Sequence, residues 1–228
     1  MPTPEIIRMC EGVPCCDAVW EAAYLRFETP AEERRKFCTR LKRLGSQMWP
    51  RDSQIVEIFC GRGNGLRALA ELGFERLEGV DLSERLLLQY DGGAVLYLAD
   101  CRKLPFERES RDIVIVQGGL HHLPLLPDDL AATLGEVARV LRPGGRLVIV
   151  EPWLTPFLRV VHLALTQSYV RRMSSKADAL ATMIDRERDT YFAWLNMSAT
   201  IIQSLDVLFR SEHTRICWGK IEYVGIRE

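Results

Sequence analysis

The stretch Glu57-Ile58-Phe59-Cys60-Gly61-Arg62-Gly63-Asn64-Gly65 joins a short apolar segment to an amphipathic one. This pattern predicts a β-strand and a helix with a glycine-rich turn between them. Glycines suit such a turn because the backbone bends tightly and a ligand can lie against it. The dinucleotide fingerprint has a further glycine three residues after Gly63, where this chain has Leu66. The spacing therefore argues against a pyrophosphate site and a nicotinamide oxidoreductase.

Strands and helices alternate around this turn. Short apolar strands are predicted at residues 54–59, 77–80, 94–98, 112–116 and 146–150, with helices at 66–72, 83–89 and 128–141. Such strands between amphipathic helices indicate a parallel sheet covered on both faces. Two more strands are expected within residues 213–227, joined by a turn at Trp218-Gly219. The sequence predicts an α/β fold with a Rossmann-like, mostly parallel seven-stranded sheet.

Helical segments flank this predicted core. Residues 1–50 are expected to be mostly helical after a short irregular start, with a strong helix over Ala31–Leu44 whose basic residues lie mostly on a solvated face. Residues 154–209 are expected to be a long helical stretch that breaks near Ser174-Ser175 and near Asn196. The predicted organisation is one domain over 1–228, with a helical lid (1–50), a cofactor-binding core (51–153), a helical cap inserted after the fifth strand (154–212) and a strand hairpin (213–228).

Two aspartates follow the next two strands. Asp81 lies about 20 residues beyond the glycine turn, the interval at which a carboxylate meets ribose hydroxyls. The alternative is that it caps the next helix, although Ser83 is better placed to do so. Asp100 and the amide of Cys101 follow the third strand and could contact adenine. Ligands in open α/β sheets bind at the carboxyl ends of the strands, so these elements together predict a nucleoside site.

In combination, these segments resemble class I S-adenosylmethionine-dependent methyltransferases. The resemblance extends to Asp112–Val116, to Gly119-Leu120-His121-His122-Leu123 and to Glu136–Gly145, and it covers roughly residues 50–151. The most similar branch is the small-molecule group that includes the ubiquinone/menaquinone-biosynthesis enzymes. This resemblance implies that S-adenosylmethionine is the cofactor. The predicted cofactor-binding residues are Glu57, Gly61, Gly63, Asp81, Leu82, Asp100, Cys101 and Gln117.

One position departs from the pattern of this family, which usually has a glycine where this chain has Phe59. The side chain is expected either to pack under the turn or to narrow the methionine end of the pocket. This departure motivates one alternative function, a non-catalytic protein with a cofactor-binding fold.

Methyl transfer from a sulfonium is an in-line displacement, so the protein supplies alignment and, where needed, a base. His121 and His122 are the candidate catalytic residues because histidine titrates near neutrality. The alternative for the pair is a structural or cofactor-shielding role. No metal is expected, and Cys60 and Cys101 are interpreted as packing residues.

The acceptor pocket is expected beside Glu151-Pro152-Trp153, under the two helical segments. Tyr24, Phe27, Tyr191 and Trp194 are the predicted wall residues. The alternative is that these aromatic side chains only hold helices together.

Composition bears on partners and compartment. The chain has 228 residues and a formal net charge of −1, which gives no overall attraction to nucleic acid or anionic membrane. The small-molecule acceptor that the resemblance implies is therefore preferred, with methylation of RNA or protein as the alternative suggested by the basic face of Arg34–Arg43. No apolar run approaches the roughly 20 residues of a membrane span. The odd number of cysteines, seven, and the lack of a secretory leader predict the cytoplasm.

Cys10, Cys15 and Cys16 are the cysteines most suggestive of metal binding. Their spacing lacks the usual two-residue spacer, and no second Cys/His pair follows. Ordinary thiols are therefore favoured over a zinc site.

Overall fold

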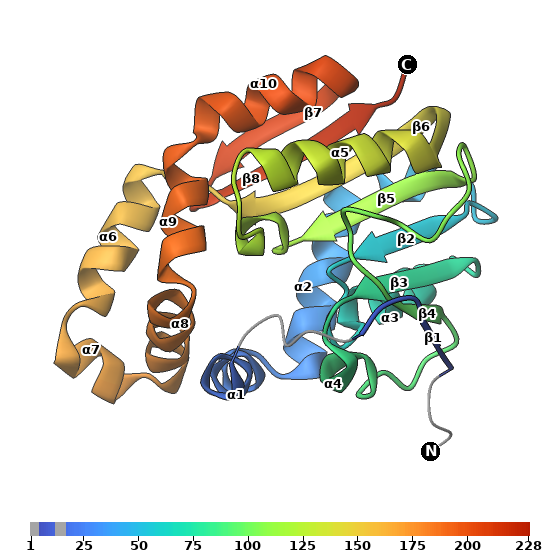
Figure 1. Cartoon of the computed structure of the whole chain (residues 1–228). Helices are drawn as coiled ribbons and strands as arrows, with labels where there is room; N and C mark the ends of the chain where they lie inside the picture. Colours follow the sequence, from blue (N-terminus) through green and yellow to red (C-terminus); the bar gives the residue numbers. More distant parts are fainter. Residues whose placement is uncertain (1–4, 12–16) are drawn as a thin grey trace.

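The chain folds around a single twisted sheet (Figure 1). The structure is a computed structural model that describes residues 5–11 and 17–228. In these residues the strands are β1 (Ile6–Arg8), β2 (Ile55–Ile58), β3 (Leu77–Asp81), β4 (Val95–Leu98), β5 (Arg111–Gln117), β6 (Leu141–Pro152), β7 (Arg210–Cys217) and β8 (Lys220–Ile226). Their order in the sheet is β1-β4-β3-β2-β5-β6-β8-β7. The pairs from β1 to β6 are parallel, and β8 and β7 add antiparallel strands at one side.

The predicted Rossmann-like, mostly parallel α/β fold is confirmed, but the predicted number of strands is wrong. The sheet has eight strands in the described residues, and the additional one is β1. Ile6 pairs with Leu96 and Arg8 with Leu98, so the start of the chain adds a parallel strand to the edge of β4. A segment as short as β1 cannot show a periodic pattern in the sequence. Its extended conformation depends on pairing with β4, which is distant in the sequence.

Helices cover both faces of the sheet. Side chains on a strand alternate between the two faces, and those of β2 and β5 do so here. Val56, Ile58 and Val114 belong to the core under α5 (Asp128–Val140) and α10 (Ser198–Leu208). Ile55 and Ile113 belong to the core under α2 (Pro30–Arg43) and α3 (Asn64–Glu71). This double burial explains why the strands read as continuous apolar runs.

The insert after β6 is helical, as predicted. It contains α6 (Pro156–Leu165), α7 (Ser168–Met173), α8 (Ser175–Arg186), α9 (Arg188–Asn196) and α10. The predicted breaks near Ser174 and Asn196 are confirmed, and further breaks lie at Thr166–Gln167 and at Glu187. The short elements of the core are η1 (Ser46–Met48), α4 (Glu84–Leu87) and η2 (Leu120–His122).

The strong helix predicted over Ala31–Leu44 is α2, shifted by one residue. The Thr29 side chain accepts from the Glu32 amide and the Glu32 side chain accepts from the Thr29 amide, a capping box that starts the helix. Gly45, with a φ of 91°, ends it. The expected solvated basic face has one clear exception, because Arg40 is only 7% exposed.

The N-terminal helix α1 (Ala18–Phe27) packs against α8, which lies beside it in Figure 1. Ala23, Ala179 and Met183 form the buried contact. Asp17 and Arg186 add an ion pair at 2.6 Å. Segments that are far apart in the sequence therefore meet beside the carboxyl ends of the strands.

Two sequence-based expectations concern the membrane and zinc. Across residues 5–11 and 17–228, the helices are too short or too polar to cross a bilayer. Cys15 and Cys16 lie outside the described residues. Cys10 is exposed, and its Sγ is 3.6 Å from the carbonyl oxygen of Leu98.

Candidate active site

The glycine turn between β2 and α3 has the backbone conformation that its sequence predicts. Gly61 and Gly63 have φ values of 52° and 73°, in the left-handed region that favours glycine. A Cβ on Gly65 would lie 2.0 Å from Oε1 of Glu57. A side chain at position 65 would therefore displace the Glu57 carboxylate, which lies against the first turn of α3.

Phe59 occupies the family's glycine position without changing the turn. Its φ is 57°, so a phenylalanine adopts the left-handed conformation there, at a strain of about 1–3 kcal/mol. The ring packs on Gly119, where an added Cβ would lie 2.2 Å from Cγ of Phe59. It also lines the cavity beside the turn. The lack of a side chain at Gly119 therefore makes room for the Phe59 ring.

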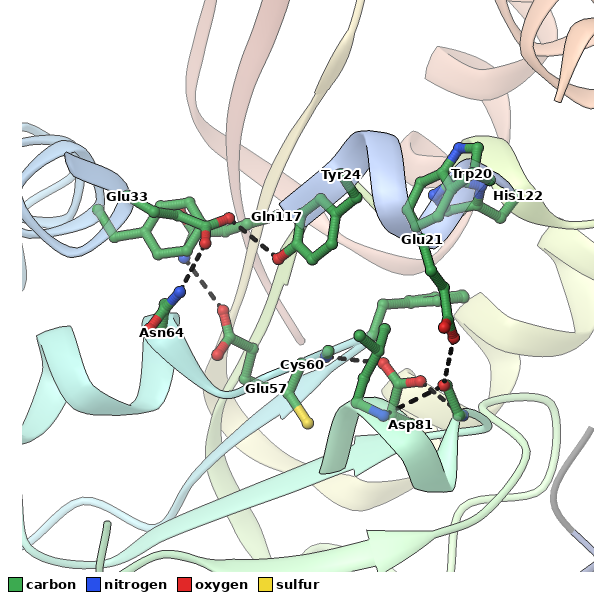
Figure 2. A pocket seen from close by; sticks show the side chains of 16 residues that line it. Trp20, Glu21, Tyr24, Glu33, Glu57, Cys60, Asn64, Asp81, Gln117 and His122 are labelled. Atoms are coloured by element: carbon green, nitrogen blue, oxygen red, sulfur yellow. Dashed lines mark hydrogen bonds between the residues drawn. The ribbon is translucent and has the colours of Figure 1, made fainter. Parts of the chain in front are cut away.

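A cavity of about 90 Å³ lies beside this turn, and Figure 2 shows the side chains around it. Carboxylates from four elements line it: Glu21 from α1, Glu33 from α2, Glu57 from β2 and Asp81 from β3. Neutral and aromatic side chains complete the wall. The site is therefore suited to a ligand that carries positive charge.

Asp81 holds the turn in place while it lines the cavity. Its Oδ2 accepts from the Gly61 amide at 2.7 Å, and its Oδ1 accepts from the Ser83 amide at 2.8 Å. Burial raises the pKa of Asp81. The Ser83 hydroxyl accepts from the Leu86 amide at 3.3 Å, which confirms Ser83 as the cap of α4. Asp81 is thus not needed as the cap.

Glu57 and Gln117 connect the turn to α2. Gln117 Nε2 donates to Glu57 Oε1 at 3.1 Å, and Arg40 donates to Gln117 Oε1 at 2.9 Å. Glu57 Oε2 is buried and has no hydrogen-bond partner among the described residues. Burial raises the pKa of Glu57 to about 8. Burial therefore favours the neutral form of this carboxyl, and a positively charged ligand group beside it would favour the ionised form.

A buried ion pair joins α2 to the glycine turn. Arg62 donates to Glu33 at 2.8 Å, and both side chains are 6% exposed. The side-chain amide of Asn64 donates to the same carboxylate at 2.6 Å, and the Tyr24 hydroxyl donates to it at 3.1 Å. Arg62 also donates to the carbonyl of Glu28 at 2.8 Å. This network fixes the N-terminal helices over the site.

Four predicted cofactor residues do not line this cavity: Gly63, Leu82, Asp100 and Cys101. The Asp100 carboxylate accepts from Arg102 at 2.7 Å, which lowers the pKa of the aspartate. The thiol of Cys101 lies 3.6 Å from the hydroxyl of Thr133, and burial raises its pKa to about 12. The structure thus gives Asp100 and Cys101 protein partners, and their contacts with adenine stay predictions.

A second cavity, of about 430 Å³, adjoins the first. The two share wall residues from both halves of the chain: Trp20, Tyr24, Glu33, Phe37, Gln117, Gly118 and His122. The predicted wall residues Tyr24, Phe27 and Tyr191 line the second cavity. Trp194 does not, because its ring is buried and its Nε1 donates to the carbonyl of Pro152 at 2.8 Å. Trp194 therefore holds the insert to the core.

The two histidines lie at different cavities. His122 lines both, whereas His121 lines only the larger one. His121 Nδ1 is 2.7 Å from Glu151 Oε2. Oε1 of that carboxylate also accepts from the amides of Gly119 and Leu120 at 2.7 and 2.9 Å. Because His121 and these amides lower the pKa of Glu151, the carboxylate is an acceptor and Nδ1 carries the hydrogen.

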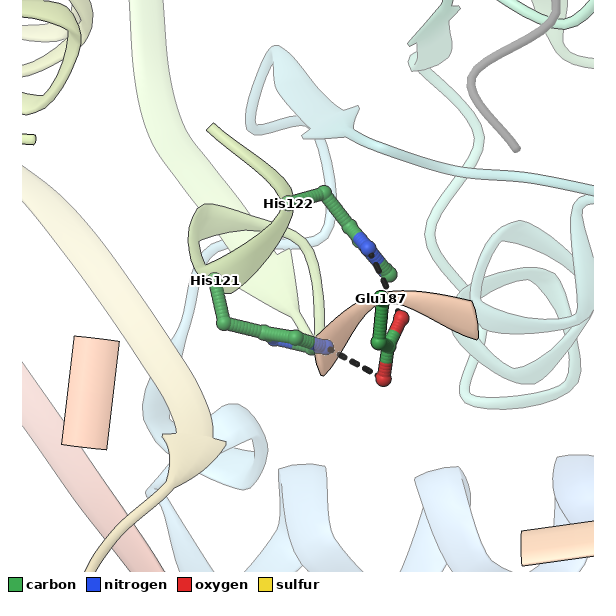
Figure 3. A group of neighbouring side chains, drawn as sticks. All are labelled: His121, His122 and Glu187. Carbon is green, nitrogen blue, oxygen red and sulfur yellow. Dashed lines mark ion pairs between the residues drawn. The ribbon is translucent and has the colours of Figure 1, made fainter. Parts of the chain in front are cut away.

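Glu187 approaches both imidazoles from the insert (Figure 3). One of its oxygens is 3.8 Å from His121 Nε2, and the other is 3.1 Å from His122 Nδ1. Trp20 Nε1 donates to Glu187 at 2.8 Å. In the described part of the chain, His121, His122 and Glu187 are the residues grouped closely enough to hold a metal ion. Their existing partners equally explain the group as a hydrogen-bonded cluster, and the expected absence of a metal stays a prediction.

Sequence reasoning missed the acidic residues that α1, α2 and the insert contribute. Glu21, Glu33 and Glu187 are each at most about one-tenth exposed. Their sequence neighbourhoods resemble ordinary helix surfaces, and Glu33 is indistinguishable from the first-turn acidic residues that stabilise a helix start. No local signal would have separated them.

Comparison with known proteins is consistent with this geometry. Residues 56–149 match the family described as methyltransferase domain. A 27-O-demethylrifamycin SV methyltransferase from Amycolatopsis mediterranei is 27% identical over 186 residues, covering 77% of this chain and 64% of the relative. The demethylmenaquinone methyltransferase of Clavibacter sepedonicus is 30% identical over 160 residues, covering 62% and 63%. The chain spans a little under two thirds of the length of these relatives.

Solved structures share the fold. A protein from Pyrococcus horikoshii has a TM-score of 0.66 at 18% identity, covering 92% of this chain and 98% of that one. The N-methyltransferase NodS from Bradyrhizobium japonicum, in complex with S-adenosylhomocysteine, has a TM-score of 0.60 at 15% identity, covering 92% and 99%. The predicted resemblance to class I S-adenosylmethionine-dependent methyltransferases is confirmed. S-adenosylmethionine is the cofactor of this class.

The residues present fit this cofactor. S-adenosylmethionine carries an ammonium and a sulfonium, and the cavity beside the turn offers four carboxylates. The unpartnered Glu57 Oε2 suits a cationic group, which would also restore the ionised form of the carboxyl. Asp81 retains acceptor capacity for ribose hydroxyls beyond its two amide bonds.

We expect Asp81→Ala to weaken S-adenosylhomocysteine binding by about 1.5–3 kcal/mol, the scale of hydrogen bonds to a charged group. Isothermal titration calorimetry measures the change. Asp91→Ala is the matched control, because Asp91 is 49% exposed and pairs with Arg67. If affinity is unchanged while stability falls, Asp81 only holds the amides of Gly61 and Ser83.

Proposed function

We propose that this chain transfers a methyl group from S-adenosylmethionine to a small-molecule acceptor in the larger cavity. The observation that carries the proposal is the wall shared by the two cavities. One cavity lies on the glycine turn, and the other is largely apolar. Its volume of about 430 Å³ is within the range of roughly 300–1,000 Å³ typical of small-molecule sites. The two relatives described above are named for small-molecule acceptors.

The cofactor is proposed to bind on one side of this shared wall, in the smaller cavity, and the acceptor on the other side, in the larger cavity. The bound cofactor supplies a methyl group activated by a positively charged sulfur. Glu57, Gly61 and Asp81 hold it, and Gln117 orients the Glu57 carboxyl. His121 is the proposed base: its Nδ1 donates a hydrogen bond to Glu151, so Nε2, which faces Glu187 at 3.8 Å, can accept a proton from the acceptor as the new bond forms. His122, at both cavities, is proposed to close the cofactor side.

The N-terminal helices and the insert are proposed to act together as a lid. The cavity on the glycine turn measures about 90 Å³, well below the roughly 300 Å³ lower end of ligand pockets. Entry of a nucleoside cofactor therefore requires α1 to shift. Trp20 donates to Glu187 and Asp17 pairs with Arg186, so α1 is linked to the insert. Closure would exclude water from the reacting groups.

The basic residues of α2 support a small acceptor over RNA. Arg34 pairs with Glu71 at 3.3 Å, and Arg43 pairs with Glu222. Lys36 pairs with Glu28. These three charges are engaged within the protein, which reduces the basic stripe that an RNA-binding surface usually presents.

A metabolite screen tests the proposal. The protein is incubated with S-adenosylmethionine bearing a trideuterated methyl group and with a cell extract separated into metabolites, RNA and protein. We expect a metabolite to gain one labelled methyl group, and Asp81→Ala to reduce the gain. Label confined to RNA or protein would support the alternative acceptors. Binding of S-adenosylhomocysteine without label in any fraction would support a non-catalytic role.

A further inference from the structure

Two cations in the larger cavity have no carboxylate partner. Arg40 and Lys220 both line it, and neither makes an ion pair within 4.0 Å among the residues that the structure describes. Arg40 is 7% exposed, and its one side-chain hydrogen bond in that set is to Gln117. Lys220 makes no side-chain hydrogen bond there. Lysine and arginine are almost never buried unpaired, because removing their charge from water is costly.

The carboxylates of the same cavity are already bound. Glu28 pairs with Lys36, and Glu33 pairs with Arg62. Glu187 accepts from Trp20 and contacts His122. The acidic groups of the wall are thus engaged elsewhere, and Arg40 and Lys220 are left without a carboxylate partner in a largely apolar cavity.

The turn between β7 and β8 places Lys220 in this space. Gly219 has a φ of 76°, and its carbonyl accepts from the Trp153 amide at 2.8 Å. Burial lowers the pKa of Lys220 to about 7, and Arg40 and Lys36 act in the same direction. The carboxylates of Glu28 and Glu151 oppose this shift without cancelling it. A bound anion would supply the missing negative charge.

We propose that Arg40 and Lys220 form a subsite for an anionic group, such as a carboxylate, on the methyl acceptor. The acceptor is then an amphipathic anion, with an apolar body against Phe27, Leu180 and Met183 and its charge at this subsite. Arginine suits the role because its guanidinium can hold a carboxylate through two parallel hydrogen bonds. The inference rests on the proposed methyl transfer to a small molecule.

The carboxylate of the methionine portion of the cofactor is the competing source of such an anion. Arg40 and Lys220 line the larger cavity, and neither lines the smaller one on the glycine turn. This placement assigns the subsite to the acceptor.

Calorimetry on the protein saturated with S-adenosylhomocysteine tests the assignment. The probes are 2-naphthoate and its neutral counterpart 2-naphthamide, which share a two-ring apolar body. We expect the carboxylate to bind about ten-fold more tightly, as for a hydrogen bond between charged groups. Lys220→Met should remove most of this preference, and Arg40→Met should act in the same direction. Lys42→Met is the control, because Lys42 is exposed and lies on α2 with Arg40. It should leave the preference for the carboxylate probe unchanged.

Three results would overturn the inference. They are equal affinity for the two probes, an unchanged preference in Lys220→Met, and a loss of S-adenosylhomocysteine affinity in Lys220→Met, which would assign the cation to the cofactor. Thermal melting of each variant separates these results from misfolding. If S-adenosylhomocysteine does not bind the wild-type protein, the proposed function itself fails. If it binds but naphthoate is not preferred, only the anion subsite fails.

Discussion

Arg62→Met is expected to lower the free energy of unfolding by about 3–5 kcal/mol, the scale for removing one partner of a buried ion pair. The substitution leaves the Glu33 carboxylate, 6% exposed, without its cation. Asn64 and Tyr24 still donate to it, but neither is charged. Denaturation in urea, followed by circular dichroism, measures the loss.

A double variant sharpens this prediction. Arg62→Met combined with Glu33→Leu removes both charges, and apolar replacement of a whole buried pair is often neutral. We therefore expect it to recover much of the lost stability. Lys176→Met is the exposed control, because Lys176 and Glu32 are 52% and 43% exposed; such pairs contribute about 0–1 kcal/mol. A loss no larger than this control in Arg62→Met would show that the Glu33 site is not a closed, buried one.

His121→Ala is expected to lower kcat by about 10²–10⁴-fold, the usual contribution of a general base. His121 lines only the acceptor cavity, so S-adenosylhomocysteine affinity should change little. The KM for S-adenosylmethionine should likewise change little, so that the loss is confined to kcat. Steady-state kinetics on the acceptor found in the metabolite screen measures both effects.

Two comparisons separate a base from other roles. Glu151→Gln keeps a hydrogen-bond acceptor for Nδ1 but removes the charge, so it should reduce kcat less than His121→Ala. His162→Ala is a matched control, because His162 contacts the Tyr191 hydroxyl at 3.0 Å and is not a wall residue of either cavity. Activity retained within a few-fold in His121→Ala would refute the base. Inactivation of the wild-type protein by EDTA would point instead to a metal at His121, His122 and Glu187.

Much of the fold could be predicted because its signals are local. The run from Gln54 to Phe59, the glycine turn and the β-branched segment Asp112–Val116 each carry their periodicity within a few residues. The break near Ser174 was readable in the same way, because Ser174 caps α8, whereas the breaks at Thr166–Gln167 and at Glu187 were not predicted. β1 was not readable, since its three residues become a strand only beside β4.

The site residues also differ in whether a local signal in the sequence predicts them. Glu57, Gly61, Asp81 and Gln117 were predicted because each lies near or just after the carboxyl end of a strand, and they meet at one cavity. The position of the Phe59 ring could not be predicted from the sequence, because the ring packs on Gly119, sixty residues away. The basic residues of α2 look alike in sequence, yet Arg40 turns inward while Arg35 stays exposed.

The sequence by itself determined the core of the sheet, the cofactor class and the edge at which we expect the cofactor to bind. These follow from backbone requirements: left-handed glycines at a turn, apolar strands buried on two faces and polar groups at their carboxyl ends. Only the tertiary structure decided the rest of the wall of the larger cavity, beyond the predicted Tyr24, Phe27 and Tyr191. Trp20, Glu187 and Lys220 come from three distant segments, and no spacing rule relates them. What unites them is burial in one cavity, where each charge needs a partner that the fold provides or leaves for a ligand.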